Sequence, residues 1–183
     1  MVEPVYLGKQ ILNESSPPFL IAEIGVNHEG SIEKAYEMIE EAAASGADAA
    51  KFQTYKAENL AAKNSPAYWD LEKEPTPSQR ELFKKYDSFS RKDYIQLAEK
   101  CKQHGIEFCS TPFDSGAVED LDPLVSFFKI ASADLTNLPL LRQVASKHKP
   151  IVLSTGASEM WEIALAVEEL RRFECQHIIL LHC

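Results

Sequence analysis

The chain has 183 residues, of which 45% are apolar and 26% are charged, an ordinary balance for a folded globular protein. Disordered, collagen-like and low-complexity classes are therefore excluded. The formal net charge is −9 and no cluster of Lys and Arg stands out, so neither nucleic acid nor an anionic membrane is expected as a partner.

Cellular location is predicted from what the sequence does not contain. No apolar run approaches the roughly 18 residues of a membrane helix. The segment Met1–Pro4 lacks the basic region and apolar run of a signal peptide. The four cysteines show no zinc-binding spacing, and Cys109, inside an apolar run, is predicted to be a buried thiol. These features favour a reduced cytoplasm.

Residues 1–18 are predicted to form a small N-terminal unit. Val5–Leu7 and Gln10–Leu12 have the pattern of a hairpin. We expect this hairpin to cap the bottom of the main domain, which takes residues 19–183.

The main domain alternates short apolar runs with amphipathic helices. The predicted strands are Phe19–Gly25, Ala47–Thr54, Ile106–Ser110, Phe127–Ala131, Ile151–Ser154 and His177–His182. The predicted helices are Ile32–Ala44, Arg91–His104, Leu138–Lys147 and Glu159–Phe173. This alternation predicts a parallel sheet with right-handed crossovers.

Several residues mark helix ends. Ser31 is a predicted N-cap, Ser90 and Asp93 match a capping box, and Gly105 stands where a helix C-cap belongs. Trp161 is interpreted as packing of the last helix. A long insertion, about 56–89, separates the second and third strands. It is interpreted either as a lid over a ligand or as a surface loop without a binding role.

Charged and polar residues interrupt the apolar runs near the ends of the strands. Glu23, Lys51 and Lys129 lie late in three of the strands, and Gln53 shares a face with Lys51. Lys and Glu are rarely buried without a partner, and the carboxyl edge is where parallel α/β folds gather functional residues. Two lysines at this edge predict an anionic ligand, either phosphate or carboxylate.

Hydroxyl side chains at the ends of three more strands could complete such a site: Ser110, Thr111, Ser132, Ser154 and Thr155. The alternative is a structural network in which the two lysines pair with Glu23, Asp48 or Asp134. Asn27 and His28, after the first core strand, are interpreted either as substrate contacts or as residues that shape the turn.

Five motifs occur in an order that resembles the catalytic barrel of the sialic acid (N-acetylneuraminate) synthase family. They are Ala22-Glu23-Ile24-Gly25-Val26-Asn27-His28-Glu29-Gly30, Lys51-Phe52-Gln53-Thr54, Ser110-Thr111-Pro112-Phe113-Asp114, Lys129-Ile130-Ala131-Ser132 and Leu153-Ser154-Thr155-Gly156. The resemblance runs from about residue 5 to residue 183. It implies a TIM (β/α)8-type barrel, here truncated to about six βα units.

The implied enzyme is a transferase that joins phosphoenolpyruvate to an N-acetylated aldose, typically N-acetylmannosamine, giving a nine-carbon 2-keto acid and phosphate. C3 of phosphoenolpyruvate attacks the sugar aldehyde, water adds at C2, and phosphate leaves with C–O cleavage. A divalent metal (Mn or Mg) and a homodimer are expected in the full-length enzyme.

The resemblance also implies roles for individual residues. The catalytic residues would be Glu23, Lys51 and Lys129, with the lysines holding phosphoenolpyruvate and Glu23 near the metal and the acceptor. The substrate-binding residues would be Gln53, which would touch the sugar, and Thr111, Ser132, Ser154 and Asn27. Asp134 follows Ser132 where the family carries an acidic residue.

The sequence departs from the family pattern after the sixth strand. The last strands, the metal-binding histidines and the small antifreeze-like domain of the family are expected beyond residue 183, so no metal ligand is expected in this chain. We therefore expect the 183-residue chain to be inactive. Two alternatives stay open: a related phosphoenolpyruvate-aldose or aldose-phosphate synthase, and a non-catalytic binding or assembly module.

Overall fold

The computed structural model describes residues 4–183, so residues 1–3 of the predicted N-terminal unit lie outside the described residues. The hairpin predicted from the sequence is present, with β1 (Val5–Leu7) antiparallel to β2 (Gln10–Leu12).

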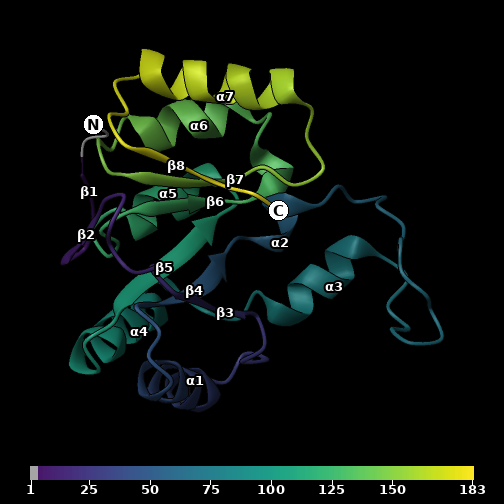
Figure 1. The fold of residues 1–183 in the computed structure, drawn as a ribbon. Coiled ribbons are helices and arrows are strands. Elements are labelled where there is room, and N and C mark those ends of the chain that lie inside the picture. The colour runs from purple at the N-terminus through teal and green to yellow at the C-terminus, as the bar shows by residue number, and fades with distance from the viewer. Residues whose placement is uncertain (1–3) are drawn as a thin grey trace.

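Six parallel strands form the centre of the molecule in two three-stranded sheets (Figure 1). The first sheet pairs β3 (Ile21–Gly25), β4 (Ala49–Thr54) and β5 (Glu107–Pro112). The second pairs β6 (Phe128–Ile130), β7 (Ile151–Ser154) and β8 (Ile178–Leu181). β5 contacts β6, which places the two sheets side by side. The predicted parallel α/β arrangement is therefore confirmed, and the sheets are open.

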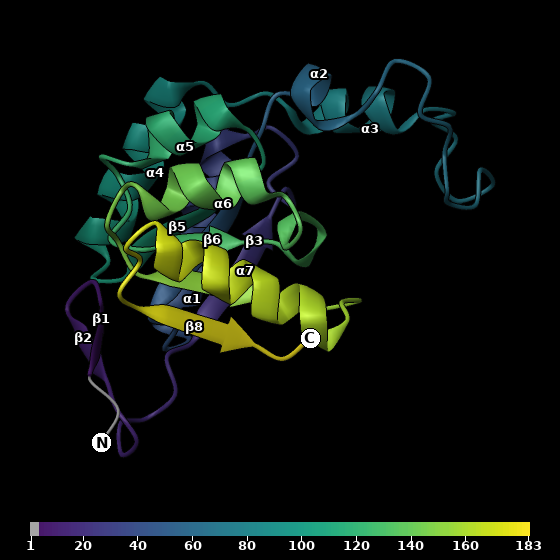
Figure 2. The same ribbon diagram turned by 90° about the horizontal axis from the view of Figure 1, so that it is seen from above.

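Helices pack against the strands and bury a common apolar core (Figure 2). The helices that follow the strands are α1 (Ile32–Ala44), α4 (Arg91–Gln103), α5 (Ser115–Leu121), α6 (Leu138–Ala145) and α7 (Met160–Arg172). A short 3-10 turn, η1 (Ser132–Asp134), follows β6. Among the described residues, the longest helices are too short, and not apolar enough, to cross a membrane.

The predicted helix-end signals are confirmed. Ser31 Oγ accepts the Lys34 N–H at 3.2 Å, and the Asp93 carboxylate accepts the Ser90 N–H at 2.7 Å. Gly105 follows α4 with a φ of +75°, a conformation that costs glycine little. The prediction for Trp161 is wrong: its side chain is 65% exposed on the outer face of α7.

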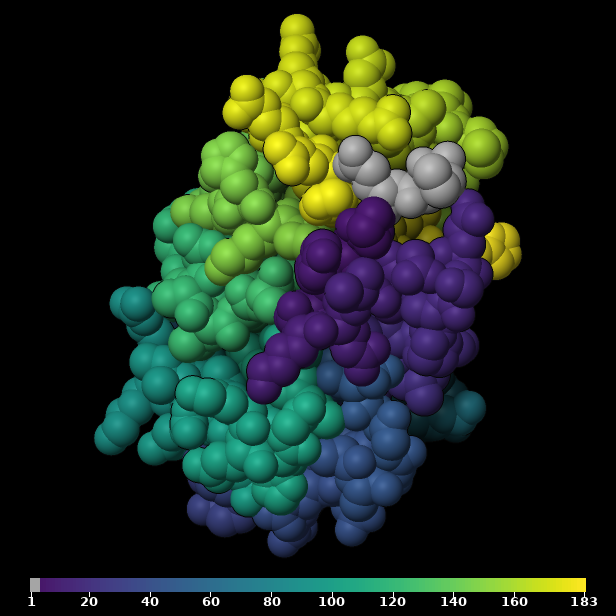
Figure 3. Space-filling model, turned by 60° about the vertical axis from the view of Figure 1, so that its left-hand side comes forward, coloured from purple at the N-terminus to yellow at the C-terminus, as the bar shows by residue number. Residues whose placement is uncertain are grey.

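The hairpin packs against apolar residues of both sheets. Leu7 lies in an apolar cluster with Ala49 and Cys109 of the first sheet and Phe127 and Val152 beside or within the second. Figure 3 shows the hairpin segment, in purple, between the yellow C-terminal part of the chain and the segments drawn in blue and teal. Cys109 is fully buried, as predicted, and burial raises the pKa of its thiol to about 12.

The insertion contains two helices, α2 (Ala57–Leu60) and α3 (Gln79–Tyr86), and is tied down at its base. Asp87 accepts Lys56 Nζ at 2.6 Å and the Ala57 N–H at 3.0 Å, so one carboxylate joins the two ends of the insertion. The stretch between α2 and α3 extends away from the body of the molecule (Figure 2).

Candidate functional site

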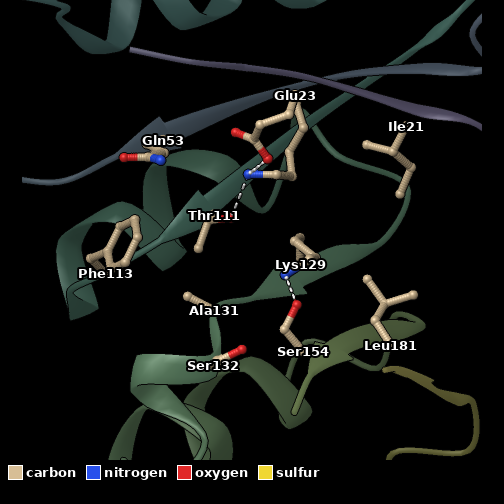
Figure 4. Close-up of a pocket in the computed structure, with 11 residues that line it drawn as sticks. Ile21, Glu23, Gln53, Thr111, Phe113, Lys129, Ala131, Ser132, Ser154 and Leu181 are labelled. Atoms are coloured by element: carbon tan, nitrogen blue, oxygen red, sulfur yellow. Dashed lines mark hydrogen bonds and ion pairs between the residues drawn. The ribbon is translucent and has the colours of Figure 1, made fainter. Parts of the chain in front are cut away.

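A cavity of about 360 Å³ lies at the carboxyl ends of the strands (Figure 4). The residues to which the family resemblance gives catalytic or substrate-binding roles line it, with the exception of Asn27. Its walls are formed by Ile21, Glu23, Lys51, Gln53, Thr111, Phe113, Lys129, Ala131, Ser132, Ser154 and Leu181. The strand register brings four of these residues together, because Glu23 pairs in register with Lys51 and Gln53 with Thr111. The lining contains no residue of the insertion.

Lys51 is held by an ion pair. Its side chain is 9% exposed, and its Nζ lies 2.7 Å from Glu23 Oε2 and 3.3 Å from Thr111 Oγ1. The Glu23 side chain is 56% exposed, so its carboxylate keeps much of its hydration while it pairs with the lysine. This pair agrees with the alternative in which Lys51 pairs with Glu23 in a structural network. It also leaves Glu23 at the mouth of the cavity, where a ligand would meet it.

Lys129 differs, because among residues 4–183 no carboxylate lies within ion-pair distance of its ammonium. The residue is 7% exposed, and its Nζ donates to Ser154 Oγ at 2.6 Å and to the Ile130 carbonyl at 2.8 Å. Burial, and then the nearby Lys51, lower the pKa of Lys129. A buried cation that has only neutral partners is costly unless a ligand supplies the missing negative charge.

The loop after β6 completes the wall on the Lys129 side. Ser132 begins η1, and its Oγ accepts the Gly156 N–H at 2.9 Å, which leaves the Ser132 hydroxyl proton for a ligand. Asp134 is not part of this wall. It accepts Asn137 Nδ2 at 3.1 Å, and burial raises the pKa of its carboxyl.

Three other candidate residues make hydrogen bonds within the protein and do not line the cavity. Ser110 Oγ lies 2.7 Å from Thr54 Oγ1, and Thr155 Oγ1 donates to the Leu181 carbonyl at 2.9 Å. His28 is buried and its Nδ1 accepts the Gly30 N–H at 3.1 Å, as the turn-shaping interpretation requires.

Asn27 lies apart from the main cavity. It lines a separate hollow between β3 and α1, and Glu23 is the one residue common to both spaces. Sequence reasoning missed the apolar part of the main cavity, because Phe113, Ala131 and Leu181 carry no chemical signal that separates them from ordinary core residues.

The donor set is suited to a small, highly charged anion. Two buried ammonium groups and several hydroxyls face one half-solvated carboxylate. Fixed charges on buried side chains interact strongly with a ligand and need little reorganisation when it binds. In the described part of the chain, no group of three His, Cys, Asp or Glu side chains is placed to hold a metal ion.

Fold and site together define an α/β protein built on parallel strands, with a cationic cavity at their carboxyl ends. The fold is similar to that of N-acetylneuraminic acid synthetase from Leptospira borgpetersenii, with a TM-score of 0.86, 33% identity, and coverage of 99% of this chain and 59% of that one. A truncated 3-deoxy-D-arabino-heptulosonate 7-phosphate synthase from Thermotoga maritima shares the fold at a TM-score of 0.69 and 16% identity, over 97% of this chain and 55% of that one.

The chain belongs to the NeuB family, whose sequence model matches residues 38–183. It is 37% identical to N,N'-diacetyllegionaminic acid synthase of Legionella pneumophila over 90% of this chain and 48% of that protein. It is 35% identical to N-acetylneuraminate-9-phosphate synthase of Drosophila melanogaster over 90% of this chain and 45% of that protein. The chain thus spans about half the length of these relatives.

Proposed function

We propose that this chain forms the phosphoenolpyruvate-binding part of a sialic-acid-type synthase. The reaction would join phosphoenolpyruvate to an N-acetylated aldose, N-acetylmannosamine or a relative, and release a nine-carbon 2-keto sugar acid and phosphate. The observation that carries this proposal is the buried Lys129 ammonium, which has only neutral partners and lies in one cavity with Lys51. Family membership supports a synthase of this general kind.

The cavity suits phosphoenolpyruvate in charge and in chemistry. The ligand carries close to three negative charges, on a phosphate and a carboxylate. Lys51 and Lys129 would neutralise these groups, while the hydroxyls of Thr111, Ser132 and Ser154 would donate to the remaining oxygens. Binding would give the Lys129 cation the negative partner that it lacks in the free protein.

The bond-forming step would take place on the Glu23 side of the cavity. C3 of phosphoenolpyruvate would attack the sugar aldehyde, forming the new carbon–carbon bond. Water would then add at C2, and phosphate would leave with cleavage of the C–O bond. Gln53 would contact the sugar, and the Glu23 carboxylate would orient the acceptor or handle a proton at the mouth. Residues 4–183 do not themselves form a metal site, so no step is assigned to a metal.

The finer architecture is also part of the proposal. We place the two sheets in a (β/α)8-type barrel of which this chain supplies about six βα units. The hairpin within residues 1–18 would cap its lower end, where Leu7 contacts residues of both sheets. The whole enzyme would be a homodimer. Its location would be cytoplasmic, in keeping with four free cysteines.

Calorimetric titration of the 183-residue chain with phosphoenolpyruvate tests the binding part of the proposal. Phosphate release from phosphoenolpyruvate and N-acetylmannosamine, with added Mn²⁺, tests turnover. We expect binding without turnover, because the chain spans about half of its relatives. Absence of binding would refute the proposal, and metal-dependent phosphate release would refute only the inactivity of this chain. Release with an aldose phosphate that lacks the N-acyl group, but not with N-acylated sugars, would favour the related aldose-phosphate synthase.

A further inference from the structure

The end of strand β4 is held by a side chain from the helix behind it. Tyr94, on α4, is buried, and its hydroxyl donates to the backbone carbonyl of Gln53 at 3.0 Å. Gln53 lines the cavity with its side chain. One residue therefore reaches from the helix layer to the backbone atom next to a predicted sugar contact.

The backbone geometry explains why the end of β4 at Gln53 needs a hydrogen bond from outside the sheet. The register of β3 with β4 shifts between Glu23 and Gly25 and ends where Gly25 pairs with Phe52, one residue before Gln53. Gly25 has a φ of +59°, so the chain turns away from β4 at this point. On the other side of β4 the backbone stays paired, since the Thr54 carbonyl accepts the Phe113 N–H at 3.1 Å.

Tyr94 is itself fixed by rings from the loops that border the site. Phe89, at the end of the insertion, packs edge-on against Tyr94 at 6.0 Å and stacks on His28 at 4.2 Å. Burial raises the pKa of Tyr94 to about 12, so its hydroxyl stays protonated as a donor at neutral pH. The donor is therefore fixed in place and constant in charge.

We propose that Tyr94 is a positioning residue for the acceptor side of the site: its hydroxyl fixes the Gln53 backbone and so the direction of the Gln53 side chain. This inference rests on the proposed function for the identity of the acceptor, an N-acylated sugar. Tyr94 is not among the hydrogen-bond partners of the two lysines, so its effect is expected on acceptor use and not on phosphoenolpyruvate binding.

The test is Tyr94→Phe, which removes the hydroxyl and keeps the ring. In the protein as its gene encodes it, we expect the KM for the N-acetylated sugar to rise about fivefold, the typical effect of one neutral hydrogen bond, and the KM for phosphoenolpyruvate to change less than twofold. Tyr36→Phe is the matched control. Tyr36, on α1, also packs against the core, with its ring facing Lys100, and no hydrogen bond joins it to Gln53. Equal rises in both KM values would overturn the proposal, because general loosening of the fold would produce them.

A second measurement does not depend on the reaction. In ¹⁵N spectra of the 183-residue chain, Tyr94→Phe should shift the Gln53 side-chain amide signals, whereas Tyr36→Phe should leave them in place. Unchanged Gln53 signals would overturn the positioning role. Shifted signals in a protein that binds neither substrate would support it and refute the proposed function instead. If Tyr94→Phe does not fold, the wild-type protein is measured in H₂O and in D₂O. Deuteration of the Tyr94 hydroxyl should then shift the ¹³C signal of the Gln53 carbonyl, and an unchanged signal would refute the hydrogen bond.

Discussion

Replacement of Lys129 by Met separates the binding role of this residue from a structural one. The wild-type ammonium is 7% exposed and is held by the Ser154 hydroxyl and the Ile130 carbonyl, without a carboxylate. Burying one charge costs several kcal/mol, and hydrogen bonds to a charged group return about 1.5–3 kcal/mol each. These contributions nearly cancel, so Lys129→Met should change the free energy of unfolding by less than about 1 kcal/mol.

The same substitution should have a large effect on ligand binding. Removing one partner of a buried charge pair costs about 3–5 kcal/mol, which corresponds to a roughly 150- to 5,000-fold loss of affinity for phosphoenolpyruvate. Calorimetric titration measures this affinity, and urea unfolding measures stability. At a phosphoenolpyruvate concentration about 100 times its Kd, the ligand should stabilise the wild type by about 2.7 kcal/mol and the variant by almost nothing.

Lys147→Met is the matched control. The Lys147 side chain is 17% exposed and pairs with Glu119 at 2.7 Å, far from the cavity lining. This variant should bind phosphoenolpyruvate as the wild type does. The reasoning fails if Lys129→Met lowers the free energy of unfolding by more than about 2 kcal/mol while phosphoenolpyruvate affinity falls less than tenfold. Lys129 would then be a structural residue.

Three further predictions follow from the site. Glu23→Gln, made in the full-length protein, should lower turnover at least about tenfold and change phosphoenolpyruvate affinity much less; steady-state kinetics with unchanged kcat would remove Glu23 from the mechanism. Phosphoenolpyruvate binding should take up protons at alkaline pH, because the pKa of free Lys129 is lowered from 10.5 and a bound anion favours its charged form; titrations in two buffers of different ionisation enthalpy measure this, and equal heats would contradict it. Asp87→Ala should raise proteolysis within the insertion, because the Asp87 carboxylate holds the end of the insertion to Lys56 and Ala57 at its start, while cleavage at the wild-type rate would show that these hydrogen bonds are dispensable.

Much of the fold is predictable because local signals and tertiary structure agree. The helix Ile32–Ala44 has the bounds that its apolar stripe and the Ser31 cap predict. The predicted strands lie within about two residues of the observed ones, since buried parallel strands are apolar along their whole length. The convergence of Glu23, Lys51 and Lys129 is predictable for a related reason. Charged residues inside apolar strands must share a polar cavity, because a charge buried alone is costly.

Other features depend on packing that a single sequence does not encode locally. The helix Ser115–Leu121 is too short for an apolar period to emerge, although Asp114 caps it by accepting the Ala117 N–H at 2.8 Å. The hydrogen bond from Tyr94 joins residues 41 positions apart and requires β4 and α4 to be in place. The prediction for Trp161 fails because hydrophobicity alone does not say which face of α7 meets the core.

The two lysines show how one site combines stability with function. Lys51 has its counter-ion in the protein, since the chain places Glu23 beside it in register on the neighbouring strand. Lys129 has none within the described residues, and its nearest partners are a hydroxyl and a carbonyl. If both lysines were paired, an incoming anion would have to displace a carboxylate twice. If neither were paired, two like charges would face each other in a buried space and oppose folding. The observed arrangement keeps the free protein foldable and leaves one cation whose charge only a ligand satisfies.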